Sequence, residues 1–207
     1  MASPRSDSQS PYSPKALEII QRTNELLASG GYNGFSYADI ATLVDVRKAS
    51  IHHHFPTKAD LVKATVVLHR EAMRRGLASL DEAKADPLDR LVAYCGYWAE
   101  CVAASNPPIC ICALLAAELP SVPAEVAAEV KGHFADLHAW IASNMAQGQS
   151  QGSLRLADNP SADASVFMAA IHGAMLTARA AGDASLFRTV ATMAADRLRA
   201  KSHAASR

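Results

Sequence analysis

One stretch of the chain decides its fold: Gly31-Tyr-Asn-Gly-Phe-Ser-Tyr-Ala-Asp-Ile-Ala-Thr-Leu-Val-Asp-Val-Arg-Lys-Ala-Ser-Ile-His-His-His-Phe-Pro-Thr-Lys-Ala-Asp-Leu61. Ile40 and Val44 lie at helical spacing in its first half, and Ile51 and Phe55 do so in its second half. The pattern predicts two short amphipathic helices joined by a tight turn and followed at once by a third helix. In such a unit one helix braces its neighbour, which can then lie in the major groove of DNA.

Residues at the ends of these helices mark their boundaries. Ser36 is a good N-cap, and Asp39 completes a capping box in which Asp replaces the usual Glu. Asp45 occupies the turn, where the backbone often needs a positive φ that Asp tolerates better than most residues. Pro56 ends the second helix because the residue before a proline avoids the helical region, and Thr57 caps the next helix.

The outward side of the second helix is basic and polar. Residues 47–63 contain four Lys or Arg residues, three His residues and a single Asp. We expect contacts to bases or the groove from Arg47, Lys48, Ser50 and His53, and phosphate positioning by Ser36, Tyr37, His52 and Lys58. The alternative for this face is an ordinary solvated helix surface, which the surrounding helix-turn-helix pattern disfavours.

Residues 14–62 resemble the DNA-binding domain of TetR-family transcriptional regulators. The family signature runs roughly Gly-Tyr, Thr/Ser, Ile-Ala, Gly-Val, Gly-x-Phe/Leu-Tyr-x-His/Tyr-Phe and Lys-x-x-Leu. This chain departs from it at Asp45, which replaces the turn glycine, and at His52, which replaces a tyrosine that contacts the DNA backbone. The resemblance implies a homodimeric repressor that binds double-stranded operator DNA and is released by a small-molecule or thiol-reactive effector bound in a C-terminal domain.

Length and composition predict a two-domain, all-α protein. The 207 residues fit a flexible tail at 1–12, a three-helix helix-turn-helix domain at 13–62 and a ligand-binding and dimerisation domain at 63–201. Lys and Arg together equal Asp and Glu at 20 each, so no global basic charge marks a nucleic-acid partner. No stretch approaches the roughly 20 apolar residues of a membrane span. We expect a cytoplasmic protein with no membrane partner, whose cysteines are reduced thiols.

Helical periodicity and helix breakers divide the rest of the chain, and no strand signal of useful length is present. The expected helices cover 14–30, 57–83, 87–106, 110–119, 124–147, 161–181 and 184–201, and a loop is expected at 148–152.

The last two expected helices carry broad apolar stripes. Val166, Ile171 and Met175 belong to one stripe, and Leu186 and Met193 belong to the other. These stripes are either buried within one subunit or packed partly against a second copy, as in the four-helix interface of TetR-like proteins. Because two-fold symmetric proteins read palindromic half-sites, we favour a homodimer.

The resemblance also places an effector pocket among the helices at 57–83, 87–106, 110–119 and 124–147. The candidates to face it are Tyr94, Trp98, Cys101, Cys110, Cys112, His133, Phe134, His138 and His172. Such a lining would suit a small, partly apolar molecule. Taken one at a time, each of these residues is explained equally well as part of the core.

The segment Pro107-Pro-Ile-Cys-Ile-Cys112 follows a helix break, which places Cys110 near a helix N-terminus, where thiol pKa values fall. The segment 110–118 is similar to the corresponding stretch of TetR-like repressors that respond to electrophiles and oxidants. Position 114 is Leu, so a basic neighbour that such sensors use is absent. Our hypothesis is that Cys110 senses an electrophile or oxidant. The alternative is that both cysteines are core residues in a pocket wall.

Other functions are less well supported, and we predict no cofactor and no metal. Cys110 and Cys112 would bind a soft metal only if their segment is not helical, and successive side chains at 52–54 diverge by about 100° on a helix. A thiol enzyme would need Cys110 within hydrogen-bond reach of a histidine such as His133 or His138. No catalytic motif accompanies such a pair, so we predict no enzyme. A helical adaptor that binds protein instead of DNA is a further alternative.

Overall fold

The structure is a computed structural model that describes residues 11–104 and 109–200. Within these ranges it contains nine α-helices, one 3-10 helix (η1, Tyr32–Gly34), one isolated β-bridge and no strand, so the predicted all-α class is confirmed. The α-helices are α1 (Pro14–Gly30), α2 (Tyr37–Val44), α3 (Lys48–His54), α4 (Lys58–Ala83), α5 (Pro87–Ala103), α6 (Ile111–Ala117), α7 (Ala124–Gln151), α8 (Pro160–Ala181) and α9 (Ala184–Leu198). The predicted tail lies outside the described residues up to position 10, as does the predicted end of the fifth helix at 105–106.

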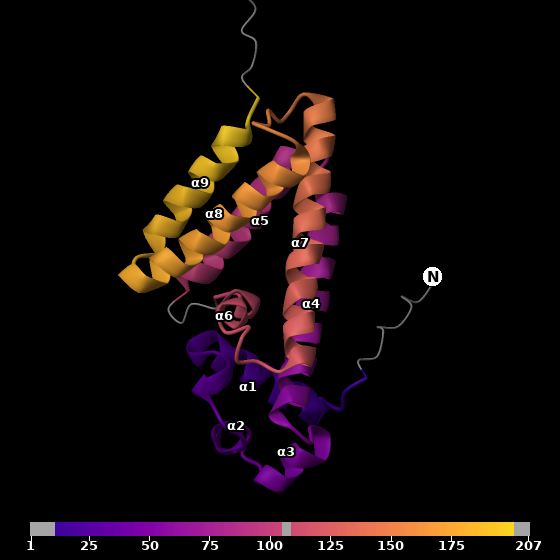
Figure 1. The fold of residues 1–207 in the computed structure, drawn as a ribbon, viewed down its shortest axis with the longest axis vertical. Helices are drawn as coiled ribbons and strands as arrows, with labels where there is room; N and C mark the ends of the chain where they lie inside the picture. The colour runs from indigo at the N-terminus through magenta and orange to yellow at the C-terminus, as the bar shows by residue number, and fades with distance from the viewer. Residues whose placement is uncertain (1–10, 105–108, 201–207) are drawn as a thin grey trace, which may run out of the picture.

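The helices form two groups joined by two long helices. Helices α1, α2 and α3 gather at one end of the molecule, whereas α5, α8 and α9 gather toward the other (Figure 1). The long helices α4 and α7 pack against each other between these groups, and the short α6 packs on α7 and α1. This arrangement places α6 between the helix-turn-helix unit and the rest of the chain.

The helix-turn-helix unit forms through the boundary signals that the sequence predicts. Asp39 accepts a hydrogen bond of 2.7 Å from the Ser36 backbone N–H, and Ser36 in turn caps α2, which gives the predicted capping box. Asp45 has φ 52° and ψ 55°, the left-handed conformation expected for the turn. Thr57 and Asp60 form a second capping box at the start of α4.

One continuous hydrophobic core joins the two groups of helices. Ile40, Ile51 and Leu61 are fully buried near the helix-turn-helix unit, and Leu137 and Phe187 are buried in the other group. Each such side chain stabilises the fold by about 1.5–3 kcal/mol when it is removed from water. The two groups therefore share packing along α4 and α7.

The predicted loop at 148–152 is wrong, because α7 continues to Gln151. The helix ends at Gly152, whose φ of 76° is the left-handed conformation that glycine adopts without strain. A Cβ atom at Gly148 would lie 2.5 Å from the side chain of Leu154, so this glycine permits the chain to fold back closely against α7. Here glycine serves packing and does not break the helix.

The last helix is shorter than predicted, because α9 ends at Leu198 and not at 201. The chain there pairs with the segment that follows α7. The Arg155 N–H donates to the Leu198 carbonyl at 2.8 Å, and the Ala200 N–H donates to the Ser153 carbonyl at 3.2 Å. These bonds satisfy backbone groups at the helix end and replace the next helical turn.

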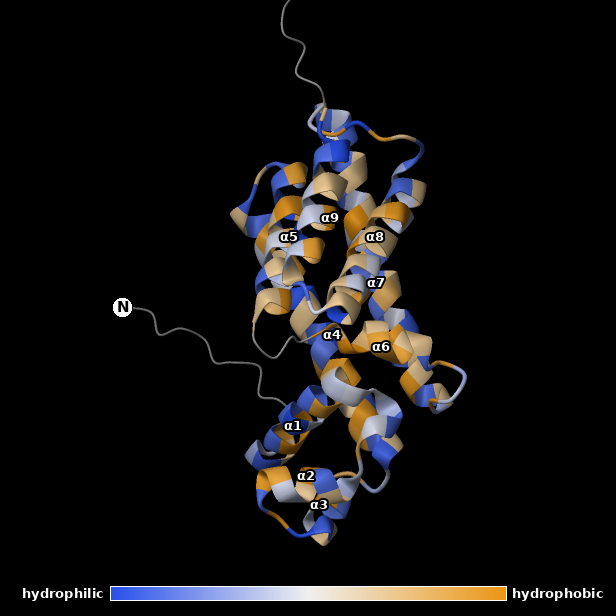
Figure 2. Cartoon of the chain, turned by 90° about the vertical axis from the view of Figure 1, so that its left-hand side faces the viewer, coloured by the Kyte–Doolittle hydropathy of each residue, from blue (hydrophilic) through white to orange (hydrophobic). Residues whose placement is uncertain are grey.

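Helix α8 is long and apolar enough to cross a membrane by length and composition, but it packs against α7 and α9, and a third of its most apolar window is buried. Figure 2 shows α8 beside α9, with apolar and polar residues interspersed along both. Such a weakly apolar helix is not a convincing membrane span. Its exposed apolar side chains include Val166, which is 68% exposed, and Leu176.

Candidate functional site

The candidate reading surface consists of α3 and the residue before it. Arg47 is the N-cap of α3 and Lys48 is its first residue; both are exposed, as is His53, whereas Ser50 is half-buried. Within residues 11–104 and 109–200, none of these four side chains forms a hydrogen bond or ion pair. Helix α3 lies at the opposite end of the molecule from α9 (Figure 1). The four side chains are therefore free to meet bases or phosphates.

Three of the residues predicted to position phosphates are engaged within the same domain. Ser36 caps α2, and the Tyr37 hydroxyl donates to the Phe55 carbonyl at 2.8 Å. The rings of Tyr37 and His52 contact each other, with centroids 4.7 Å apart. These contacts order the surface beside α3, and any phosphate contact from them remains a prediction.

Lys58 has a different environment from the one its sequence position suggests. Its ammonium group donates to the Phe35 carbonyl and lies 4.0 Å from the centroid of the Phe35 ring and 4.9 Å from that of Tyr32. Burial lowers the pKa of Lys58, against the opposing effect of nearby carboxylates. Lys58 thus joins the start of α4 to the 3-10 helix, an interaction that helix-capping signals alone do not indicate.

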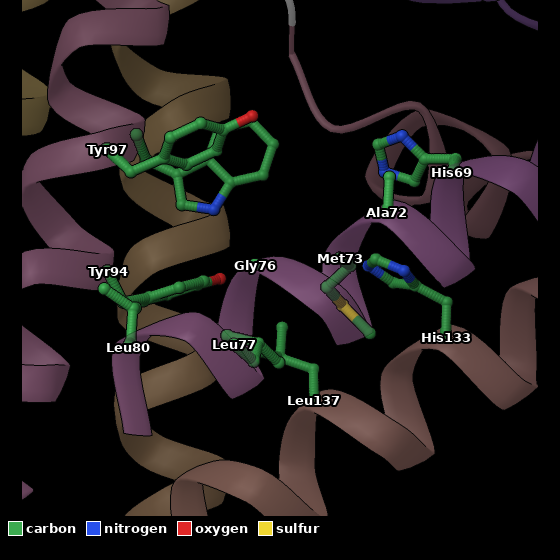
Figure 3. A pocket seen from close by; sticks show the side chains of 11 residues that line it. His69, Ala72, Met73, Gly76, Leu77, Leu80, Tyr94, Tyr97, His133 and Leu137 are labelled. Atoms are coloured by element: carbon green, nitrogen blue, oxygen red, sulfur yellow. The ribbon is translucent and has the colours of Figure 1, made fainter. Parts of the chain in front are cut away.

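A cavity of about 270 Å³ lies between α4, α5 and α7. Figure 3 shows the imidazoles of His69 and His133 at one end and Tyr94 and Tyr97 at the other. The lining residues are His69, Ala72, Met73, Gly76, Leu77, Leu80, Tyr94, Tyr97, Trp98, His133 and Leu137. This is the apolar kind of lining, with a few polar groups, that small-molecule sites have.

Three of the predicted effector candidates line the cavity, namely Tyr94, Trp98 and His133. The helix at 57–83 is predicted to bound the pocket, but none of its side chains is named, and Tyr97 and Leu137 are also missed. The missed positions from His69 to Leu80 follow one another at intervals of three and one residues, which is a single helical face. That periodicity is visible in the sequence. The sequence does not show that this face lines a cavity, because an apolar helical face is usually buried in a core.

Cys110 and Cys112 lie beside the histidine end of the cavity. The Cys110 Sγ atom is 3.5 Å from His133 Nε2 and 3.8 Å from His69 Nε2. Cys110, Cys112 and His133 are buried, whereas His69 is half-buried and reaches the cavity. The four side chains come from α4, the start of α6 and α7, and we call them the thiol–imidazole cluster.

The thiol–imidazole cluster changes the acidity of its cysteines. Hydrogen bonds, first from Cys112 and then from histidines including His133, hold the pKa of Cys110 well below its usual range, although burial opposes this. The pKa of Cys112 is raised, because its thiol donates to Cys110 and is itself buried. By contrast, burial alone raises the pKa of Cys95 to about 12. The contacts of Cys110, and not its burial, therefore make it the acidic thiol.

Phe134 and His172 form a second layer behind the cluster. The Phe134 ring contacts the rings of His133 and His172, with centroids 5.4 Å and 5.1 Å apart respectively. His172 Nδ1 is 2.8 Å from the Met168 carbonyl oxygen. Burial would lower the pKa of His172, but its contact with Cys110 raises that pKa on balance.

The structure does not bring the remaining two candidates into this group. His138 Nε2 lies 3.0 Å from the Ser161 carbonyl oxygen and 3.1 Å from the Ser165 hydroxyl, so it faces α8. Cys101 is half-buried near the end of α5, where it contacts Tyr97. Neither residue lines the cavity.

Two side chains join the C-terminal helices to the end of α1. Glu118, the residue that follows α6, accepts a 2.6 Å hydrogen bond from the Tyr32 backbone N–H. Arg179 on α8 donates to the carbonyls of Ala28 and Ser29 at 2.8 Å and 2.7 Å. A cation at these carbonyls is favourable because they form the negative end of the α1 dipole.

Comparisons with known proteins agree with this arrangement. Residues 19–65 match the family described as bacterial regulatory proteins, tetR family, and residues 87–194 match the tetracyclin repressor-like C-terminal domain. A TetR-family transcriptional regulator from Agrobacterium tumefaciens is 46% identical, with a TM-score of 0.88, over 90% of this chain and 98% of that one. Two further structures have the same fold. The reduced form of NemR from E. coli is 18% identical, with a TM-score of 0.83, over 92% of this chain and 100% of that one. A TetR transcriptional regulator from Legionella pneumophila is 22% identical, with a TM-score of 0.80, over 92% of this chain and 100% of that one. No curated protein matches the chain.

Proposed function

The chain belongs to the TetR family of transcriptional regulators, and we propose that it is a repressor that leaves its operator when an effector occupies the cavity between α4, α5 and α7. Proteins of this family bind operator DNA as homodimers and respond to small molecules. In this chain, Arg47, Lys48, Ser50 and His53 are the proposed DNA contacts, because they lie on or just before α3 and form no hydrogen bond or ion pair within the described residues.

The position of α6 is the observation that carries this proposal. Its first turn holds Cys112 and follows Cys110, both beside the cavity, while Glu118 at its other end binds the backbone after α1. A molecule that displaces the start of α6 therefore acts on a helix whose far end touches the DNA-binding unit. An effector needs only to bind the displaced state more tightly to shift the population.

We place the dimer interface on α8 and α9. Val166 and Leu176 on α8 and Val190 and Met193 on α9 are exposed apolar side chains within one subunit. Burial of these side chains against a second copy would remove them from water and would place two reading helices on one operator. A DNA-binding role also requires access to the chromosome, so we place the protein in the cytoplasm.

The cavity suits a small and largely apolar effector with one polar group. Tyr94, Tyr97 and Trp98 supply aromatic walls, and His69 and His133 supply hydrogen-bonding atoms at one end. The volume of about 270 Å³ is slightly below that of most drug-sized sites, which favours a small molecule.

A thiol-reactive effector is a second candidate, favoured by the contact between Cys110 and His133. The 3.5 Å separation allows the imidazole to accept the thiol proton as the sulfur forms a bond to an electrophile. Cys110 is fully buried, so such a reagent would have to arrive through the cavity. We assign no catalytic role to this pair, because TetR-family regulators are generally non-enzymatic DNA-binding proteins.

The test is operator binding by the purified protein, using DNA from upstream of its own gene across a salt series. A library of small aromatic compounds and an alkylating agent are then scored for release of this DNA. Release by the alkylating agent in the wild type and in Cys95→Ser, but not in Cys110→Ser, would support the thiol-reactive effector. Release by a reversible compound in all three proteins would support the cavity ligand. Absence of specific, salt-dependent DNA binding would refute the repressor function.

A further inference from the structure

We propose that His69, Cys110, Cys112 and His133 form a binding site for one zinc ion at the inner end of the cavity. Each residue offers one ligand atom, and the four ligand atoms lie within 4.8 Å of one another. Two cysteines and two histidines are a common ligand set for zinc in proteins. No metal is predicted from the sequence, because the two histidines lie far from the two cysteines in the chain and only the fold brings the four ligands together.

Two of the ligand separations fit a shared tetrahedral ion. Zinc binds sulfur at about 2.3 Å and imidazole nitrogen at about 2.0–2.1 Å, so tetrahedral angles place a sulfur and a nitrogen ligand about 3.6 Å apart. Cys110 Sγ lies 3.5 Å from His133 Nε2 and 3.8 Å from His69 Nε2. These two separations are close to that value, and all four ligand atoms lie within 4.8 Å of one another, so side-chain movements can bring them to one ion.

The local backbone allows both cysteine side chains to face the two histidines. Cys110 precedes α6 with φ −53° and ψ 115°, which is not helical, and Cys112 lies in the first turn. Two cysteines at i and i+2 within a regular helix would point about 200° apart. Because Cys110 is not helical, this obstacle is absent. Metal binding by these thiols is predicted only for a segment that is not helical.

Two buried imidazoles lack the partners that such groups normally have. His133 is 2% exposed, its Nε2 faces Cys110, and its Nδ1 has no hydrogen-bond partner within the described residues. His172 has its Nδ1 on the Met168 carbonyl, which leaves the Nε2 lone pair available, and this Nε2 also has no hydrogen-bond partner there. His133 directs Nε2 at the cluster, so Nε2 is the atom that would coordinate the cation, and its Nδ1 would still lack a partner within the described residues.

The cavity supplies a route to the site. His69 and His133 line the cavity, whereas Cys110 and Cys112 lie behind them. An ion that enters through the cavity would meet the two histidines first and would then link α4, the start of α6 and α7. Any effect of this link on DNA release rests on the proposed function, but binding of zinc does not.

The experiment uses the full-length protein, reduced with a phosphine, freed of metal by dialysis against a chelator, and titrated with Co²⁺ and then Zn²⁺. We expect one Co²⁺ per chain, visible d–d bands of tetrahedral geometry and a near-ultraviolet thiolate-to-cobalt charge-transfer band. Zinc should displace cobalt and remove these bands, and X-ray absorption at the zinc edge should show two sulfur and two nitrogen ligands. Cobalt bound without thiolate charge transfer would refute the site.

Variants separate this site from other thiols and imidazoles. Cys110→Ser and Cys112→Ser should weaken zinc binding by about 100-fold or more, since even residues behind the ligands contribute about 10–100-fold. Cys95→Ser removes a buried thiol elsewhere and His138→Ala removes an imidazole outside the cavity, so both should bind zinc like the wild type. Equal zinc affinity in all four variants would overturn the proposal.

A measurement on the wild type alone guards against variants that do not fold. In the native protein, zinc should protect two of the four cysteines of each chain from a thiol reagent, and protection of none would overturn the proposal. Operator binding is measured in parallel with the zinc-free protein. Failure of DNA binding would count against the repressor function alone, whereas failure to bind zinc would count against this site alone.

Discussion

The carboxylate of Glu118 accepts a 2.6 Å hydrogen bond from the backbone N–H of Tyr32, which lies 86 positions earlier in the chain. The bond joins the end of α6 to the first residue after Gly31, where α1 has ended. Because α6 begins at the thiol–imidazole cluster, one short helix connects the cluster to the DNA-binding unit. This connection makes Glu118 the first residue to test.

Replacement of Glu118 by Ala should lower the free energy of unfolding by about 1 kcal/mol, because a charge-assisted hydrogen bond to the Tyr32 N–H is lost. Glu118→Gln keeps an acceptor and should retain part of this stability. Urea unfolding measures both variants. Glu125→Ala, at an exposed position on α7, is the control and should change stability by less than about 0.5 kcal/mol. Equal effects of Glu118→Ala and the control would show that the bond contributes nothing.

Gly31→Ala should destabilise the protein by about 1–3 kcal/mol, because φ 71° with ψ −166° is a conformation that essentially only glycine adopts. The added Cβ would also lie 2.4 Å from a carboxylate oxygen of Glu118 and would displace it. Gly34→Ala is the matched control, because within the described part of the chain a Cβ there meets no atom within 4 Å apart from its chain neighbours. Thermal unfolding of the two variants compares them directly, and a stable Gly31→Ala protein would contradict the prediction.

Arg47→Ala and Lys48→Ala should each weaken operator binding, because both side chains are exposed at the start of α3. If one contacts a phosphate, the slope of log affinity against log salt should fall by about 0.9; if it contacts a base, specificity should relax at one position of the site. Fluorescence anisotropy across a salt series measures the slope. Lys131→Ala on α7 should leave both quantities unchanged.

Gly76→Ala should raise stability by about 0.5–1 kcal/mol and at the same time reduce the response to a cavity ligand. Gly76 lies within α4 and lines the cavity, and among the described residues a Cβ there meets no atom within 4 Å outside its own helical turn. Gly96→Ala in α5 gives the same helix stabilisation outside the cavity lining. Thermal unfolding should therefore show a similar gain for both variants. Operator release by a compound from the screen should weaken only in Gly76→Ala.

The ion pair of Arg70 with Asp136 should make stability depend on acid pH. The hydrogen bond from Arg70 lowers the pKa of Asp136 to about 2. A lowered carboxylate pKa stabilises the fold above its unfolded value of about 3.9, and this stability is lost as the pH falls toward 2. The pair is partly exposed, so solvent screening limits its contribution to about 1 kcal/mol.

Asp136→Asn should therefore unfold at lower urea than the wild type at pH 7, and the gap should narrow between about pH 4 and pH 2. Asp196→Asn removes an exposed carboxylate whose ion pair with Arg199 is 3.9 Å long, and it should show no such gap. A gap that stays constant down to pH 2 would mean that Asp136 acts through packing and not through its charge.

Helix boundaries in the DNA-binding unit follow from the sequence because capping is local. Ser36, Asp39 and Asp45 act on backbone groups within a few residues, and the structure shows each of them in its predicted conformation or contact. The predicted break at Gly148 failed for a non-local reason, namely the contact with Leu154. Glycine carries the same sequence signal whether it ends a helix or admits a neighbour.

The site was less predictable because it depends on which helices meet. The sequence identified Cys110, Cys112 and His133 but could not place His69 beside them, 41 residues away from Cys110. His138 lies one and a half turns along α7 from His133 and faces α8 instead. Aromatic contacts determined the position of Lys58 in the same way. Composition indicates that such side chains are present, but only tertiary packing selects among them.

The two hydrogen bonds that Arg179 donates to the end of α1 have a consequence for cells that contain several regulators of this family. In the proposed dimer, α8 both meets the second copy and holds the end of α1 through the carbonyls of Ala28 and Ser29. A mismatched partner at that interface would tilt α8, and through the Arg179 contacts this tilt would displace α1 and the DNA-binding unit without any effector. Dimers of two different subunits would then bind operators weakly. The same helix would therefore ensure both that identical subunits pair and that only such pairs bind their operator.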